Sequence, residues 1–88
     1  MLTLQTDVVH TQTDYGTVLL DEHSGRYWTL NPTGTLVLRV LLGGGSTTEA
    51  ADAIAESYDV DVATANRDVQ ALLTDLHAAG LVGTNTSF

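Results

Sequence analysis

The sequence predicts one small α+β domain in which a three-stranded antiparallel sheet is followed by three helices. The first third of the 88 residues is rich in β-branched and aromatic residues and contains two turn signals. The remainder shows apolar residues at helical spacing, divided by a run of three glycines. This length fits a single domain over residues 1–88, with a core from about residue 8 to residue 82.

The strands are expected over residues 6–13, 17–21 and 26–30. The first is rich in β-branched residues but weakly patterned, and the Asp-Tyr-Gly run at 14–16 supplies the turn after it. The other two strands form a hairpin in which Gly25 can adopt a positive φ. Trp28 and Leu30 alternate with polar or amphipathic neighbours, so both are expected to point into the core.

The helices are expected over residues 31–42, 46–57 and 61–80. The first begins with Asn31 as a cap and with Pro32, whose φ is already helical, and the glycines at 43–45 end it. The second begins with the capping-box pattern Ser-Thr-Thr-Glu at 46–49. Three strands followed by three helices resemble a winged helix-turn-helix module with its wing at the N-terminus.

The third predicted helix has one apolar stripe with polar residues on both sides. The stripe consists of Val62, Ala65, Val69, Leu72, Leu73 and Leu76. One flank consists of Asn66, Gln70 and His77, and the other of Asp68 and Asp75. Leu73 falls at the margin of the stripe and Leu72 deeper within it, so Leu73 is expected to be the more accessible leucine.

The charge of the chain excludes several classes of partner. It has three Arg, no Lys and eleven acidic residues, a formal net charge of −8. Such a chain repels phosphate backbones and anionic membranes, so neither nucleic acid nor a membrane is expected as a partner. No signal peptide or long apolar run is present, and a cytoplasmic location is expected.

The sequence offers no convergent set of catalytic or metal-binding residues. Cysteine is absent, which removes disulfides, thiolate catalysis and Cys-rich zinc sites. His10, His23 and His77 are scattered over a strand, a turn and a helix. The glycine run at 43–45 precedes a helix but lacks the lysine of a phosphate-binding loop. We therefore expect a binding protein without enzymatic activity, metal or cofactor.

The strand at 26–30, with the sequence Arg-Tyr-Trp-Thr-Leu, is the best candidate for a binding surface. A strand at the edge of a sheet presents unpaired N–H and C=O groups, which invite another strand. If this strand lies at the edge and beside the third helix, an incoming peptide finds hydrogen bonds on one side and an apolar groove on the other. The segment therefore predicts a site for an extended peptide.

Five segments of the sequence form a recognisable set: Tyr15–Asp21, Gly25–Trp28, Leu30–Gly34, Asp68–Leu73 and Ala79–Val82. In this order they resemble the PqqD-like peptide-recognition proteins, also called RiPP recognition elements. The match is closest to the stand-alone members of lasso peptide biosynthesis and covers about Val8 to Val82.

This resemblance implies binding of the leader segment of a ribosomally made precursor peptide, which the protein presents to a separate leader peptidase and an ATP-dependent cyclase. The leader is expected to add as a strand to residues 26–30 and to pack against the third helix. The implied contacts are Arg26, Tyr27, Trp28, Thr29, Leu30, Asn66, Arg67, Val69, Gln70 and Leu73.

Two alternatives remain open from the sequence. A related recognition protein could serve another modifying enzyme, as in quinone cofactor biosynthesis, and would differ only in its partner. A DNA-binding winged helix would place the third helix as its recognition helix. That helix carries Arg67 among acidic residues, which gives the DNA alternative little support.

Overall fold

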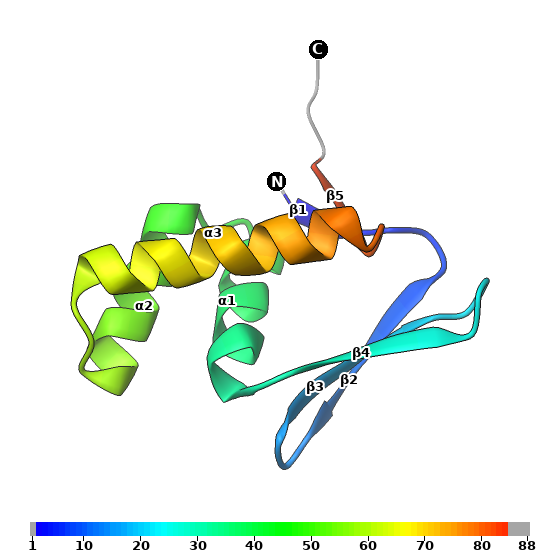
Figure 1. Ribbon diagram of the computed structural model, residues 1–88, viewed down its shortest axis with the longest axis horizontal. Helices are drawn as coiled ribbons and strands as arrows, with labels where there is room; N and C mark the ends of the chain where they lie inside the picture. Colours follow the sequence, from blue (N-terminus) through cyan, green and yellow to red (C-terminus); the bar gives the residue numbers. More distant parts are fainter. Residues whose placement is uncertain (1, 85–88) are drawn as a thin grey trace.

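The computed structural model describes residues 2–84 and confirms an α+β domain with a three-stranded antiparallel sheet and three helices. In chain order the elements are β1 (Leu2–Leu4), β2 (Val8–Thr13), β3 (Gly16–Asp21), β4 (Arg26–Leu30), α1 (Pro32–Leu42), α2 (Thr47–Tyr58), α3 (Val62–Ala78) and β5 (Val82–Thr84). The larger sheet extends away from the helices as a wing (Figure 1).

The wing has the strand order β2-β3-β4, with all pairs antiparallel. A two-residue turn at Asp14 and Tyr15 joins β2 to β3, and Tyr15 at its tip is 86% exposed. The β3–β4 turn is longer and closes when the Gly25 N–H donates to the Asp21 carbonyl at 2.8 Å. β2 and β4 therefore form the two edges of the sheet.

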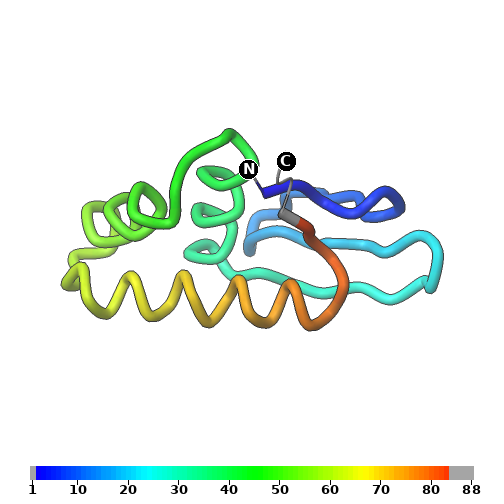
Figure 2. Tube along the Cα trace, turned by 90° about the horizontal axis from the view of Figure 1, so that it is seen from above, coloured from blue at the N-terminus to red at the C-terminus, as the bar shows by residue number. Residues whose placement is uncertain are grey.

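The helices form the other half of the molecule. α1 packs against both α2 and β3, and α2 packs against α3 (Figure 1). Seen from above, α3 runs along one side of the molecule, with β4 as the nearest strand of the wing and β2 as the farthest (Figure 2). The edge strand predicted from the sequence is therefore confirmed as an edge and lies on the side of α3.

A second sheet, formed by β1 and β5, was not expected from the sequence. Leu2 pairs with Thr84 and Leu4 with Val82, so the two ends of the described chain lie side by side. Gly83 and Thr84 belong to β5 and extend the fold beyond the core that was expected to end at about residue 82. Residues 85–88 lie outside the described part of the chain. Such short strands have no alternating pattern of their own, and the pairing spans nearly the whole sequence.

The core lies between the helices and the face of the wing that carries Leu19 and Leu30. Its fully buried large side chains are Leu19, Val37, Ile54, Val69 and Leu81. Leu30 is buried as expected, whereas Trp28 on the same face is only partly buried. Val62, expected in the apolar stripe, is exposed because it stands in the first turn of α3, beyond the packed part of the helix.

The junction between β4 and α1 is tightly packed. The Gly34 N–H donates to Asn31 Oδ1 at 2.8 Å, which caps α1 as predicted. A Cβ on Gly16 would lie 1.8 Å from the Leu30 carbonyl oxygen, and the φ of Gly16 is +144°. The Thr17 and Thr35 hydroxyls are 2.7 Å apart and hydrogen-bond across β3 and α1. These contacts fix the direction in which α1 leaves the sheet.

α3 has well-defined ends. Asp61 accepts a hydrogen bond from the Thr64 N–H at 2.7 Å. At the other end the Leu81 N–H donates to the Leu76 carbonyl and the Gly80 N–H to the His77 carbonyl, with Gly80 at φ +74°. None of the helices that the structure describes is long and apolar enough to cross a membrane.

We expect Gly16→Ala to destabilise the fold more than Gly25→Ala. Both glycines have positive φ, +144° at Gly16 and +76° at Gly25, so each substitution costs about 1–3 kcal/mol of backbone strain. A Cβ at Gly25 meets nothing within 4 Å, whereas one at Gly16 meets the backbone of Leu30. Urea unfolding of the two variants measures the difference. Equal losses of stability would show that the β4–α1 junction tolerates movement.

We also expect the Asp61 cap to make stability depend on pH. Hydrogen bonds from Thr64 hold the pKa of Asp61 below its ordinary value of 3.8; the backbone N–H has the largest effect and the hydroxyl the next largest. A lowered pKa in the folded state gives stability that is present above pH 3.8 and lost as the pH falls through the folded value. Asp61→Asn also caps a helix but does not titrate, so its stability should fall less between neutral pH and about pH 2.5. Urea unfolding at both pH values measures the stability of the two proteins. Equal losses of stability would contradict this prediction.

Candidate functional site

The orientation of the β3 backbone follows from one hydrogen bond at the end of the wing. The Glu22 N–H donates to the Asp7 carbonyl at 2.8 Å, one position beyond the pair formed by Val8 and Asp21. In an antiparallel ladder, hydrogen-bonded and non-hydrogen-bonded pairs alternate. The backbone of Glu22 therefore points to β2, and that of Asp21 points the other way, to β4.

The same alternation along β3 assigns the backbone of β4. Leu19 is opposite Trp28 and Thr17 is opposite Leu30, and both β3 residues point their backbone to β4. Trp28 and Leu30 are thus the residues that hydrogen-bond to β3. Tyr27 and Thr29 lie between these pairs, so their N–H and C=O groups point outward. No other strand within residues 2–84 pairs with this edge.

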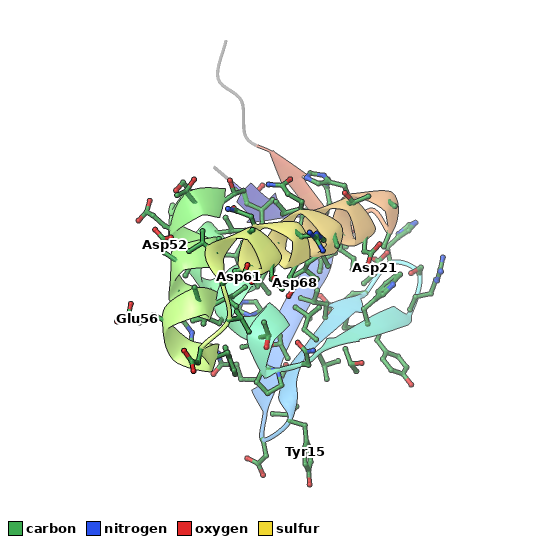
Figure 3. The ribbon with its side chains drawn as sticks, turned by 60° about the vertical axis from the view of Figure 1, so that its left-hand side comes forward. Tyr15, Asp21, Asp52, Glu56, Asp61 and Asp68 are labelled. Atoms are coloured by element: carbon green, nitrogen blue, oxygen red, sulfur yellow. The ribbon has the colours of Figure 1, made fainter. Side chains whose placement is uncertain are left out.

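A hollow of about 370 Å³ adjoins the C-terminal end of the β4 edge. Its walls come from the start of α1 and from α3, and the residues that line it are Asn31, Thr33, Gly34, Val37, Ile54, Asp68, Leu72 and Asp75. Val37 and Ile54 at its base are almost fully buried, so Leu72 is the large apolar side chain among its lining residues that remains partly accessible. Asp68 projects from the side of α3 that faces the sheet (Figure 3). The hollow therefore combines apolar surface with two carboxylates on the α3 side.

Leu72 and Leu73 lie on different sides of α3. Adjacent helical residues are separated by about 100° around the axis. Leu72 lines the hollow beside α1 and β4, whereas Leu73 lines another hollow with Leu2, Leu41 and His77. Both leucines are partly buried, so the expectation that Leu72 lies deeper than Leu73 stays a prediction, but the structure places them in different hollows. The spacing alone could not show this, because both residues fall within the apolar stripe.

The other residues predicted on α3 are also away from this hollow. Val69 is fully buried in the core, and Arg67 is exposed to solvent. Asn66 and Gln70 share the flank of Leu73 and do not line the hollow beside β4. The structure instead brings Asp68, Leu72 and Asp75 to it. The sequence did contain the signal, because Asp68 and Asp75 form the opposite flank of the stripe, but nothing in it shows which flank faces β4.

The predicted residues of β4 lie together, as any strand requires, but they differ in exposure. Tyr27 is 68% exposed and Thr29 is exposed, on the face of the wing away from the helices. The Arg26 guanidinium carbon lies 5.1 Å from the centre of the Trp28 ring, close enough for a cation–π interaction. Leu30 is part of the core. This edge thus offers a backbone ladder with an aromatic residue on each face.

The described residues contain no arrangement suited to metal chemistry. Within residues 2–84 no group of three or more His, Asp or Glu side chains is positioned to hold a metal ion.

At the β3–β4 turn, desolvation would raise the pKa of Asp21. Hydrogen bonds from the Ser24 hydroxyl and the His23 and Ser24 backbone outweigh it, and the pKa lies below its ordinary value. This carboxylate acts as a turn-stabilising acceptor.

A wing with a free edge beside a helix and a hollow that contains an accessible leucine defines a small domain suited to binding an extended chain. The sequence matches the family model of coenzyme PQQ synthesis protein D (PqqD) over residues 16–82, and the protein belongs to this family. No match was found among curated proteins.

Two solved structures are similar over nearly their whole length. A lasso peptide synthetase B1, complexed with the leader peptide, is 40% identical, with a TM-score of 0.88 over 94% of this chain and 98% of that one. TbiB1, in complex with the TbiA(beta) leader peptide, is 29% identical, with a TM-score of 0.84 over 97% of this chain and 99% of that one.

Proposed function

We propose that this protein is a RiPP recognition element that binds the leader segment of a lasso peptide precursor and presents it to a separate leader peptidase and an ATP-dependent cyclase. The observation that carries the proposal is the free β4 edge, with outward backbone groups at Tyr27 and Thr29, beside the α3 hollow. Two similar structures of nearly the same length, both solved with leader peptides, support leader binding. The cytoplasm, where a precursor is translated, is the location we propose.

In this proposal the leader becomes the next strand of the wing. Its backbone hydrogen-bonds to the N–H and C=O groups of Tyr27 and Thr29. Side chains opposite Trp28 and Leu30 share the face that carries the helices, so they approach the α3 hollow. Side chains opposite Tyr27 share its exposed face. The side chain opposite Leu30 lies nearest to the hollow, because Asn31, the next residue of this chain, lines it.

Backbone pairing with the β4 edge and one apolar contact with Leu72 share the affinity in this arrangement. Full burial of a leucine-sized side chain contributes about 1.5–3 kcal/mol, and its partial burial against Leu72 contributes less. The carboxylates of Asp68 and Asp75 disfavour an acidic residue of the leader at the same position. The net charge of −8 gives no general attraction to acidic peptides. Selectivity thus comes from the apolar residue opposite Leu30 and from the exclusion of negative charge.

The family description favours a second candidate, in which the bound peptide is the precursor of a quinone cofactor. The same edge and hollow would serve it, so the two candidates differ in the peptide and in the enzyme that receives it. Competition between the two kinds of leader for this protein, measured by fluorescence anisotropy, separates them. We expect the lasso-type leader to bind more tightly.

The first test concerns activity. We expect the purified protein to leave a precursor peptide unchanged in mass, because the described residues contain no convergent catalytic set. Addition of the cognate peptidase should remove the leader, and faster with this protein present than without it, because binding raises the effective concentration of substrate. Mass spectrometry follows both reactions. Cleavage by the protein alone would contradict the proposal.

The second test removes one backbone donor from the β4 edge. Thr29→Pro deletes an N–H that points outward, so leader affinity should fall at least about tenfold, which is about 1.4 kcal/mol, while the β3–β4 ladder keeps its hydrogen bonds. Thr29→Val keeps the N–H and serves as the control. Leader affinity is measured by calorimetry and stability by urea unfolding. If Thr29→Pro unfolds the protein, the N–H points to β3 and our assignment of the edge is wrong.

The third test compares the two adjacent leucines of α3. Both are partly buried, so Leu72→Ala and Leu73→Ala should cost similar stability, about 2–3 kcal/mol each. Only Leu72 lines the hollow beside β4. Leu72→Ala should therefore weaken leader binding at least about fivefold, or about 1 kcal/mol, and Leu73→Ala should leave it unchanged. The reverse result would place the leader on the Leu73 side of the helix.

A further inference from the structure

The wing has a second free edge, formed by β2. Because Val9 and Thr11 pair with β3 residues whose backbone points to β2, the backbone groups of His10 and Gln12 point outward. Val8 also points outward, but its N–H already donates to the Gln5 carbonyl at 3.0 Å. No other strand in the described part of the chain pairs with β2 on this side. His10 and Gln12 therefore offer the same kind of ladder as Tyr27 and Thr29.

Two hollows run beside this edge, between β2 and α1. One has a volume of about 260 Å³ and the other about 340 Å³, and Gln12, Thr35 and Arg39 line both. We call the two together the β2–α1 groove. Its first part has an apolar wall of Leu38 and Leu42. A strand edge again lies beside a helical wall, on the opposite side of the sheet from β4.

The charge in the middle of the β2–α1 groove is opposite to that of the molecule as a whole. Arg39, one of three cationic side chains in a chain of net charge −8, lines both hollows and is exposed. His10 lies in the first hollow, while Asp14 and Tyr58 lie in the second. The part between Leu42 and Gln12 thus has a cation and no carboxylate among its lining residues. A ligand carboxylate fits there.

We propose that the β2–α1 groove binds an extended segment of the peptidase that removes the leader, with an Asp or Glu of that segment placed against Arg39. The proposal rests on the proposed function. β3 separates the two edges, so a leader on β4 leaves β2 accessible. Presentation of the leader to the peptidase also needs a contact with the peptidase that persists while the leader is bound. A second copy of this chain fits poorly, because one Arg does not offset the repulsion between two chains of net charge −8.

The test measures binding of the purified cognate peptidase to the protein–leader complex, by biolayer interferometry. Arg39→Glu should weaken peptidase binding at least about tenfold, while Arg39→Lys, which keeps the charge, should retain most of it. Gln12→Pro removes an outward N–H and should weaken peptidase binding, whereas Gln12→Val, which keeps this N–H, should not. Added salt should weaken the complex formed by the unchanged protein.

Leader affinity, measured separately by anisotropy, distinguishes the two proposals. All four variants should bind the leader as the unchanged protein does, because β4 and α3 are untouched. If the unchanged protein fails to bind the leader, the proposed function fails. If it binds the leader but Arg39→Glu and Gln12→Pro bind the peptidase normally, the inference about the β2–α1 groove is overturned. A concentration-dependent dimer in sedimentation that Gln12→Pro abolishes would also overturn it, because a second copy would then occupy the edge.

Discussion

The close approach of the β3 start to the β4–α1 junction is the constraint on which the rest of the structure depends. The Leu30 carbonyl occupies the space where a side chain on Gly16 would stand, and Asn31 begins α1 immediately afterwards. The direction of α1 then sets the positions of α2 and α3, which pack on it in turn. The hollow beside β4 exists because α1 leaves the sheet at this angle and lets α3 pass alongside. A shift at this junction would move the α3 wall relative to the β4 edge.

Free strand edges are usually liabilities, since they promote aggregation, and this small wing has two of them. Both are bordered by helical surface, and the two differ in charge. The β4 edge adjoins Asp68 and Asp75, whereas the β2 edge adjoins Arg39. The net charge of −8 opposes the association of two copies through these edges. The two edges can therefore bind different partners, a leader at β4 and an acidic segment at β2 in our proposals.

The sequence predicted helix starts and turns correctly, because residues close together in the chain determine them. The Asn31-Pro32 start of α1 and the capping box at the start of α2 both occur in the structure as expected. The turn chemistry around Gly25 likewise gave the β3–β4 hairpin. The β1–β5 pair was missed because its strands are three residues long and its partners lie at opposite ends of the chain. Pairing of that kind depends on where the rest of the fold places the two termini.

The sequence by itself determined the fold class, the family and the strand that forms the candidate site, because patterning, caps and turns are set by neighbouring residues. It also determined that α3 has two polar flanks. Only the tertiary structure decided which flank faces β4, and it selected Asp68, Leu72 and Asp75 over Asn66, Gln70 and Leu73. Likewise, it decided that Tyr27 and Thr29 point their backbone outward. Both outcomes depend on the rotation of an element about its own axis, which packing against distant residues fixes and local sequence does not.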